Sequence, residues 1–169
     1  MFTQSVRLAP AARRLGLLAF AASAIAGSGC STGRQAAEVR LRADSEKGLA
    51  ESRAASAETR EHFLKCTASF TGQYATGAGS PTEIAETAVG DCSSDLDDYE
   101  LAREGVHRFL RLVGNGPLPD ADYLWAISRK EAAADRAELA ATARQWSIKG
   151  VIDTRNAVAK AHPPADSVS

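Results

Sequence analysis

The fold is decided by residues 61–112, which read EHFLKCTASFTGQYATGAGSPTEIAETAVGDCSSDLDDYELAREGVHRFLRL. In the first part of this stretch, apolar side chains recur at helical spacing on one face: Phe63, Cys66, Phe70 and Tyr74. Glycines follow at 77 and 79, and then Ser-Pro-Thr-Glu at 80–83. That tetrapeptide is typical of a helix start, because the serine caps, the proline suits the first turn and the glutamate completes a capping box. The stretch therefore predicts two helices joined by a tight turn.

The second predicted helix runs from Pro81 to about Val113. Its apolar residues continue one stripe: Ile84, Ala88, Cys92, Leu96, Tyr99, Val106, Phe109, Leu110 and Val113. Gly90 and Gly105 lie inside it, and each costs up to about 1 kcal/mol relative to alanine. A bend at Gly90-Asp91 is therefore one expectation. The segment Gly-Asn-Gly-Pro-Leu-Pro at 114–119 ends the helix.

Cys66 and Cys92 lie on the two apolar stripes of this predicted hairpin. Cys66 precedes the end of the first helix by about nine residues and Cys92 follows the start of the second by about eleven, so at 1.5 Å per residue their heights differ by about 3 Å. A disulfide tolerates that offset when the Cα atoms approach within about 7 Å. We expect a Cys66–Cys92 disulfide in an oxidising compartment. The alternative is two free cysteines that pack as small apolar residues.

The first thirty residues have the pattern of a secretory signal. Arg7, Arg13 and Arg14 supply a positively charged start, and an apolar run follows from Leu15 to Ile25. A run of about eleven residues is too short to span a bilayer, which takes about 20. We expect residues 1–29 to be a signal peptide that is removed from the mature chain.

The apolar run ends in Gly27-Ser28-Gly29-Cys30, in which small residues lead directly to a cysteine. This junction resembles the lipobox of bacterial lipoproteins, and the resemblance covers only the signal and its junction. It implies cleavage before Cys30 and lipidation of that residue with a diacylglyceryl group and an N-acyl chain. Ser31 at the next position resembles lipoproteins sorted to the outer membrane of a Gram-negative cell. The implied location is the cell envelope, with the domain anchored in the outer membrane and facing the periplasm.

The alternative is ordinary secretion, with cleavage at Ala22-Ser23-Ala24 or Ala24-Ile25-Ala26 and a soluble periplasmic or secreted product. That route leaves three cysteines in an exported chain, so one would be unpaired. Lipidation of Cys30 removes the odd thiol and leaves an even pair. The cysteine count therefore favours the lipoprotein. Two or more acyl chains would give stable anchoring, because each buried methylene contributes about 0.8 kcal/mol.

The mature chain reads as a single helical domain. Removing residues 1–29 takes away three arginines and no acid, so the formal charge changes from −1 to about −4. That mildly acidic balance argues against nucleic acid as a partner and against electrostatic binding to anionic lipid. Alanine is abundant, and no alternating apolar run predicts a strand.

We expect an all-α, up-down-up bundle of three main helices with a disulfide-stapled helical hairpin. Asp120 caps the third helix, which ends either at Lys149-Gly150 or at Ala161. The predicted divisions are a lipidated N-terminus and tether at 30–44, a helical domain at 45–161, whose first helix ends at Tyr74, and a disordered tail at 162–169. Large side chains are expected to supply most of the core: Phe63, Phe70, Tyr99, Phe109, Tyr123, Leu124 and Trp146.

Several groups of polar residues could form a functional site or could have an ordinary structural role. His62 and Cys66 are four residues apart and Cys92 might join them around a metal, but no fourth ligand is evident and the disulfide is favoured. An acidic run, Asp91, Asp95, Asp97, Asp98 and Glu100, lacks the glycine and closing glutamate of a calcium loop and fits a solvated helix face. No hydrolase, phosphate-binding or dinucleotide motif is present in the sequence. We therefore predict no catalytic residue, no metal site and no cofactor.

The sequence favours a non-catalytic envelope lipoprotein that acts as a scaffold or protein-interaction module. It would attach to the membrane through the lipid on Cys30 and bind an envelope protein that the sequence does not identify. Trp125 is a candidate partner contact or core edge. The alternative is a periplasmic bundle that binds a small ligand or metal, with a cavity among Tyr99, Phe109, Tyr123 and Trp146. A third hypothesis is a small enzyme that uses Asp97 or Asp98.

Overall fold

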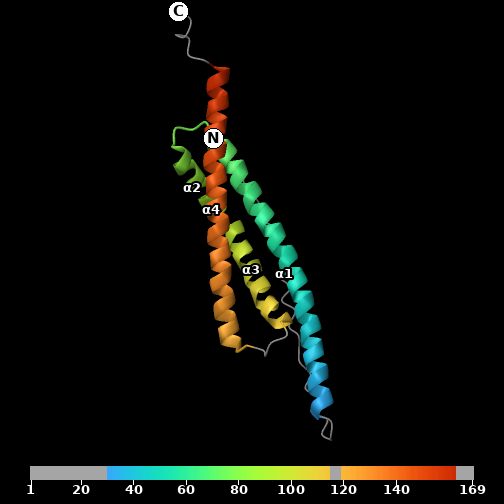
Figure 1. The fold of residues 1–169 in the computed structure, drawn as a ribbon. Helices are drawn as coiled ribbons and strands as arrows, with labels where there is room; N and C mark the ends of the chain where they lie inside the picture. Colours follow the sequence, from blue (N-terminus) through green and yellow to red (C-terminus); the bar gives the residue numbers. More distant parts are fainter. Residues whose placement is uncertain (1–29, 115–118, 163–169) are drawn as a thin grey trace, which may run out of the picture.

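The structure, a computed structural model, describes residues 30–114 and 119–162, and within these ranges every regular element is an α-helix. The helices are α1 (Cys30–Tyr74), α2 (Pro81–Asp91), α3 (Ser93–Val113) and α4 (Ala121–Ala161). The chain ascends through α1, descends through α2 and α3, and ascends again through α4 (Figure 1). The predicted all-α class is confirmed, whereas the predicted count of three main helices is wrong. The predicted signal peptide at 1–29 and residues 163–169 of the predicted tail lie outside the described ranges.

The first helix is longer than predicted, because it already begins at Cys30. The segment 30–44, which we expected to be a spacer, is the first third of α1, and the side chains from Ala36 to Asp44 are all exposed. Burial begins at Ser45 and Leu49, where α3 comes alongside; an added Cβ on Gly48 would lie 2.5 Å from the ring of Phe109. The start of α1 therefore projects from the bundle as a helical stalk (Figure 1).

The turn between α1 and α2 is closed as the sequence predicts. Ser80 Oγ accepts a hydrogen bond from the Glu83 amide at 3.2 Å, and the Glu83 carboxylate accepts one from the Ser80 amide at 2.7 Å. This capping box, with Pro81 in the first turn, satisfies amides that have no partner inside the helix. The backbone and side-chain hydrogen bonds from Ser80 lower the pKa of Glu83 below its usual 4.5.

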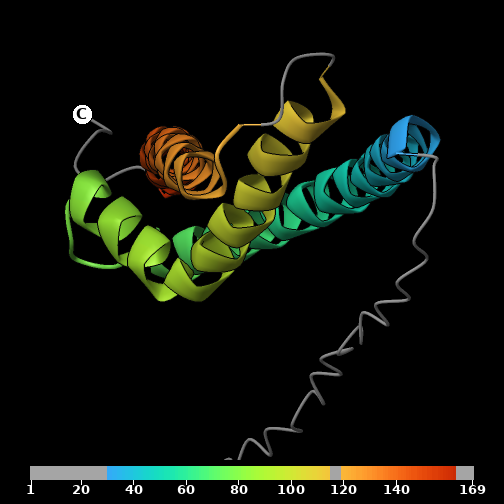
Figure 2. The same cartoon turned by 90° about the horizontal axis from the view of Figure 1, so that it is seen from below.

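The second predicted helix is two helices, and the break falls at Cys92. Cys92 has φ −102° and ψ 17°, and its amide bonds back to the carbonyl of Gly90, which ends α2 after Asp91. Figure 2, seen along the bundle, shows α2 and α3 bent around α4. A straight rod would not allow both contacts, because α2 packs mainly on α4 and α3 packs mainly on α1 and α4. Tertiary packing therefore sets the break two residues beyond Gly90.

The fourth helix begins as predicted and follows the longer of the two expected courses. The side chain of Asp120 accepts hydrogen bonds from the amides of Asp122 and Tyr123 at 3.0 and 3.2 Å. The helix passes through Gly150, where an added Cβ would lie 3.7 Å from Thr71 Cγ2, and continues to Ala161. Beyond Val151 most of its residues are exposed, so its last turns overhang the bundle (Figure 1).

The main core joins all four helices, through Phe63, Val89, Cys92, Leu96, Tyr99, Leu139 and Ala143. A smaller cluster of Ala75, Ile84 and Val151 lies under the turn between α1 and α2. Phe63, Tyr99 and Leu124 are buried as predicted, and Phe70 and Phe109 are partly buried. The expectation that Tyr123 and Trp146 fill the core is wrong, because both are mostly exposed. None of the described helices contains a stretch apolar and long enough to cross a membrane.

Candidate functional site

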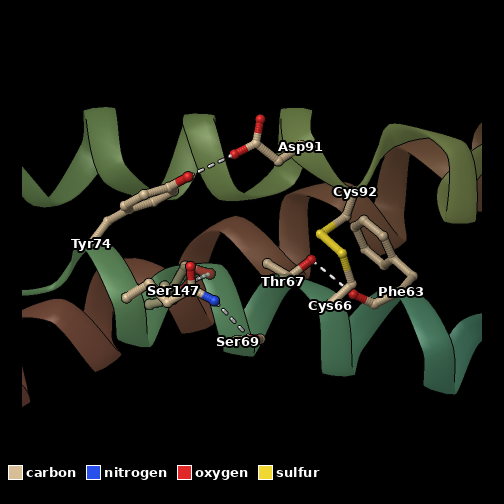
Figure 3. Close-up of a disulfide and its surroundings, with 10 residues drawn as sticks. Phe63, Cys66, Thr67, Ser69, Tyr74, Asp91, Cys92 and Ser147 are labelled. Carbon is tan, nitrogen blue, oxygen red and sulfur yellow. Dashed lines mark hydrogen bonds between the residues drawn. A yellow bond between two sulfur atoms is a disulfide. The ribbon is translucent and has the colours of Figure 1, made fainter. Parts of the chain in front are cut away.

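The predicted disulfide is present. Cys66 of α1 and Cys92, at the junction of α2 and α3, have their Cα atoms 6.0 Å apart and their sulfur atoms bonded (Figure 3). Cys92 is buried beside Phe63, so the bond ties the break between α2 and α3 to the last third of α1. Tyr74 adds a second link, because its hydroxyl donates to the Asp91 carboxylate at 3.2 Å. Burial and the Asp91 charge both raise the pKa of Tyr74.

The hypothesis that His62, Cys66 and Cys92 bind a metal ion is wrong, because the sulfur atoms of the two cysteines are bonded to each other. His62 is exposed on α1. Among residues 30–114 and 119–162, no three His, Cys, Asp or Glu side chains are grouped so as to hold a metal ion. In the acidic run, Asp97 and Glu100 pair with Arg136 of α4, at 2.7 and 3.1 Å. Part of this face is thus a contact between helices rather than a solvated surface.

The cavity expected among four aromatic residues is not formed, because these residues lie at different places. Phe109 lies against Gly48, toward the start of α1, whereas Trp146 lies beside Thr71 and Ser147. Tyr99 is buried in the core and Tyr123 is exposed. Gly48 and Thr71 are 23 residues apart on one helix, or about 34 Å, so one ligand cannot touch both Phe109 and Trp146.

A groove of about 280 Å³ lies instead between α1 and α4. We call it the α1–α4 groove; it is lined by Leu64, Thr67, Ala68, Thr71 and Gly72 of α1 and by Ala143, Trp146, Ser147, Gly150 and Thr154 of α4. Its floor is buried and small, whereas Trp146 on its rim is 57% exposed. An added Cβ on Gly72 would touch nothing within 4 Å, so this side of the groove is open.

The hydroxyl groups in the floor already have partners within the chain. Thr67 Oγ1 donates to the carbonyl of Phe63 at 2.9 Å, and Thr71 Oγ1 donates to Ser147 Oγ at 2.8 Å. An apolar side chain that covers the floor therefore breaks none of these bonds, and desolvation of the buried hydroxyls is already compensated. The groove suits an apolar occupant.

A charged contact, which we call the α3–α4 seam, joins Arg103, His107 and Arg111 of α3 to Glu131 and Asp135 of α4. His107 Nε2 lies 2.6 Å from Asp135 Oδ2, and His107 Nδ1 lies 3.1 Å from Glu131 Oε2. Each ring nitrogen of His107 therefore faces a carboxylate oxygen of α4. The seam has the composition of a catalytic site, but its charges are paired with one another across a helix contact.

The carboxylates of the seam are held in the ionised form. The hydrogen bonds from Arg111 outweigh burial and lower the pKa of Glu131 below its usual 4.5. Burial alone would raise the pKa of Asp135, but hydrogen bonds from His107 and Arg103 outweigh it and leave the pKa below 3.8. An ionised carboxylate pair that is fully engaged by cations is poorly suited to general acid catalysis.

Sequence reasoning missed both the groove and the seam. The seam had a readable signal, because Arg103, His107 and Arg111 recur every four residues on one side and Glu131 and Asp135 do so on the other. The groove had no such signal in the sequence, because its alanine, threonine and serine residues are as typical of a close contact between two helices as of an open groove. Cys30, the predicted lipidation site, is the first residue of α1, and its lipidation stays a prediction.

No protein-family model, curated protein or solved structure matches the chain.

Proposed function

We propose that the protein is a non-catalytic, lipid-anchored protein of the cell envelope that acts as an interaction module. In this proposal the lipid on Cys30 holds the chain at the outer membrane, and the α1–α4 groove receives an apolar helix of an envelope partner. The observation that carries the proposal is the open groove with an exposed tryptophan on its rim, since exposed tryptophans are enriched at the centres of protein interfaces.

The position of the groove fits a role at a distance from the membrane. The α1 residues that line it, 64–72, lie 34–42 residues after Cys30 on one continuous helix, which is about 50–60 Å. A lipid on Cys30 would therefore leave the groove far from the bilayer surface, where a periplasmic partner can reach it.

The shape of the groove favours a helix as the occupant. Its floor is made of small side chains on two helices that diverge, so the backbone of a third helix can approach closely. The floor hydroxyls are internally bonded, so the partner needs apolar rather than hydrogen-bonding side chains at the contact.

The test is site-specific photo-crosslinking in the native envelope. A photoreactive residue at Ala68, which is exposed in the groove, is compared with one at Ala55, which is exposed on α1 outside it. We expect a discrete adduct from position 68 that is absent from position 55. Equal adducts from both positions, or none from either, would contradict the proposal.

A blocking variant makes this test sharper. Gly72→Leu places a side chain over the open side of the groove, and Gly90→Leu is its matched control, because an added Cβ meets nothing within 4 Å at either glycine. We expect Gly72→Leu to abolish the adduct from position 68 and Gly90→Leu to keep it, with both variants as stable as the parent chain. Mass spectrometry of the mature N-terminus tests the anchor separately, since a diacylglyceryl group on Cys30 gives a defined mass increase.

The alternative function, binding of a small apolar ligand, rests on the same groove. Its volume of about 280 Å³ is just below the range of about 300–1,000 Å³ in which most ligand pockets fall. A small molecule that co-purifies with the parent chain and is lost in Gly72→Leu, without any protein adduct from position 68, would favour this alternative.

A further inference from the structure

A second hollow, with a different chemistry from the α1–α4 groove, lies where α1, α3 and α4 meet. It has a volume of about 170 Å³, and we call it the Tyr99 pocket. Arg60 precedes Leu64 of the groove by one turn of α1, and Thr142 precedes Trp146 of the groove by one turn of α4. The pocket therefore continues the groove toward the start of α4, at the lower end of the bundle (Figure 1). Its lining is mostly polar and consists of Arg60, Tyr99, Asp135, Glu138, Leu139 and Thr142.

Tyr99 is the buried polar member of this pocket, since it is only 9% exposed and belongs to the main core. Within residues 30–114 and 119–162 its hydroxyl has no hydrogen-bond partner, although buried hydroxyls usually have one. Burial raises the pKa of Tyr99, so the hydroxyl stays protonated and is free to donate. A small molecule in the pocket would supply the missing acceptor.

Two opposite charges line the pocket from different helices. Arg60 of α1 and Glu138 of α4 are exposed, and neither has an ion pair or a hydrogen bond with another residue in the described part of the chain. The second carboxylate at the pocket, Asp135, is already engaged by Arg103 and His107. The pocket therefore keeps one guanidinium group and one carboxylate available for a ligand.

This combination of groups is complementary to a small zwitterion. A guanidinium group binds a carboxylate through two parallel hydrogen bonds, and a carboxylate accepts charge-assisted hydrogen bonds from an ammonium group. A cavity of about 150 Å³ holds a molecule of the size of benzene, so the Tyr99 pocket accommodates about six to nine heavy atoms. That is the size of a free amino acid with a short side chain.

We propose that the Tyr99 pocket binds a small free α-amino acid. Arg60 would hold the carboxylate of the amino acid, and the Tyr99 hydroxyl would donate a further hydrogen bond to it. Glu138 would hold the ammonium group, and Leu139 would contact the short side chain. This inference depends neither on the lipid at Cys30 nor on a partner in the α1–α4 groove, so its failure would leave the proposed function untouched.

Calorimetric titration of the purified chain with L-alanine tests the ligand class, and two analogues that each lack one charge are the controls. N-acetyl-L-alanine keeps the carboxylate without the ammonium group, whereas L-alanine methyl ester keeps the ammonium group without the carboxylate. We expect L-alanine to bind saturably in the millimolar range and both analogues to bind at least about tenfold more weakly, because each loses one charge-assisted contact. Absence of saturable binding, or an analogue that binds as tightly as L-alanine, would overturn the proposal.

Variants test whether the binding occurs in the pocket. Arg60→Gln and Glu138→Gln should each weaken L-alanine binding by about tenfold, and Tyr99→Phe should weaken it by a smaller factor. Arg53→Gln of α1 and Glu86→Gln of α2, at exposed positions outside the pocket, are the matched controls and should bind like the parent chain. Binding that is unchanged in both Arg60→Gln and Glu138→Gln would refute the site.

Amide chemical shifts locate the bound amino acid without any substitution. In the isotope-labelled parent chain, L-alanine should shift the amide signals of Tyr99, Leu139 and Thr142 with the same dissociation constant that calorimetry gives. Shifts centred on Trp146 and Gly150 instead would mean that L-alanine binds in the α1–α4 groove, and the inference about the Tyr99 pocket would then be wrong.

Discussion

Arg111 of α3 and Glu131 of α4 are joined by two parallel hydrogen bonds, from Nη2 to Oε1 at 2.6 Å and from Nη1 to Oε2 at 2.8 Å. Bidentate pairs of this kind are stronger and more directional than single charged contacts. Together with Asp135, which accepts from Arg103 and contacts His107, the pair joins the lower halves of α3 and α4. The seam therefore makes the docking of α4 depend on the ionisation of two carboxylates.

The first prediction concerns acid. The folded pKa values of Glu131 and Asp135 lie below the usual 4.5 and 3.8, so both carboxylates stabilise the fold above those values. That contribution is lost as the pH falls through the lower folded pKa values. Thermal unfolding from about pH 7 to about pH 3 should show the parent chain losing its advantage over Glu131→Gln with Asp135→Asn. A stability gap that stays constant over this range would show that the seam is not ionised as described.

The second prediction concerns the disulfide. Cys66 and Cys92 are 26 positions apart, and a closed loop of that size stabilises the fold by about 3–4 kcal/mol in the chain-entropy account. Cys66→Ala with Cys92→Ala should lower the free energy of unfolding by about that amount, as measured by urea denaturation. Because Cys92 has no side-chain cap for α3, amide exchange should rise most at the junction of α2 and α3. A loss spread evenly over all four helices would argue against a local role.

The third prediction ranks two phenylalanines on α1. Phe63 is fully buried in the main core, whereas Phe70 is only partly buried and stacks on Tyr74, with ring centroids 5.8 Å apart. Phe63→Ala should cost about 3–5 kcal/mol, because it leaves a cavity that four helices surround. Phe70→Ala should cost about half as much or less. Urea midpoints in the reverse order would mean that the core is centred closer to the α1–α2 turn.

The sequence was most informative where local chemistry decides the structure. The turn at Ser80, the cap at Asp120 and the Cys66–Cys92 pair follow from residues close in the chain or from helix geometry alone. The bend expected at Gly90-Asp91 lies directly before the observed break at Cys92. A complete break does not follow from the sequence, because one apolar stripe continues through α2 and α3, whereas in the structure α2 packs mainly on α4 and α3 mainly on α1.

At the candidate site, the main error of the sequence analysis was to place large side chains in the core that are exposed in the structure. Trp146 falls at an apolar helical position, and periodicity cannot tell a core residue from one on the exposed rim of a groove. Tyr123 and Trp125 occupy the first turn of α4, where the bundle ends and an apolar residue has little to pack against. Only the relative placement of the helices shows which apolar positions remain free for a partner.

The fourth prediction concerns Arg155, whose guanidinium donates to the carbonyls of Ala75, Gly77 and Gly79 at 2.8, 2.7 and 2.6 Å. These three carbonyls lie in the turn between α1 and α2, outside both helices, so Arg155 holds the turn against α4. Arg155→Met keeps the aliphatic stem but removes all three bonds, and it should cost about 1–3 kcal/mol. Lys160→Met, at an exposed position further along α4, is the matched control and should leave stability unchanged.

Urea denaturation and amide exchange of residues 75–80 measure the effect. Faster exchange in the turn without a change at Lys160→Met is the expected pattern, whereas equal behaviour of the two variants would mean that the core of Ala75, Ile84 and Val151 holds the turn without help from Arg155.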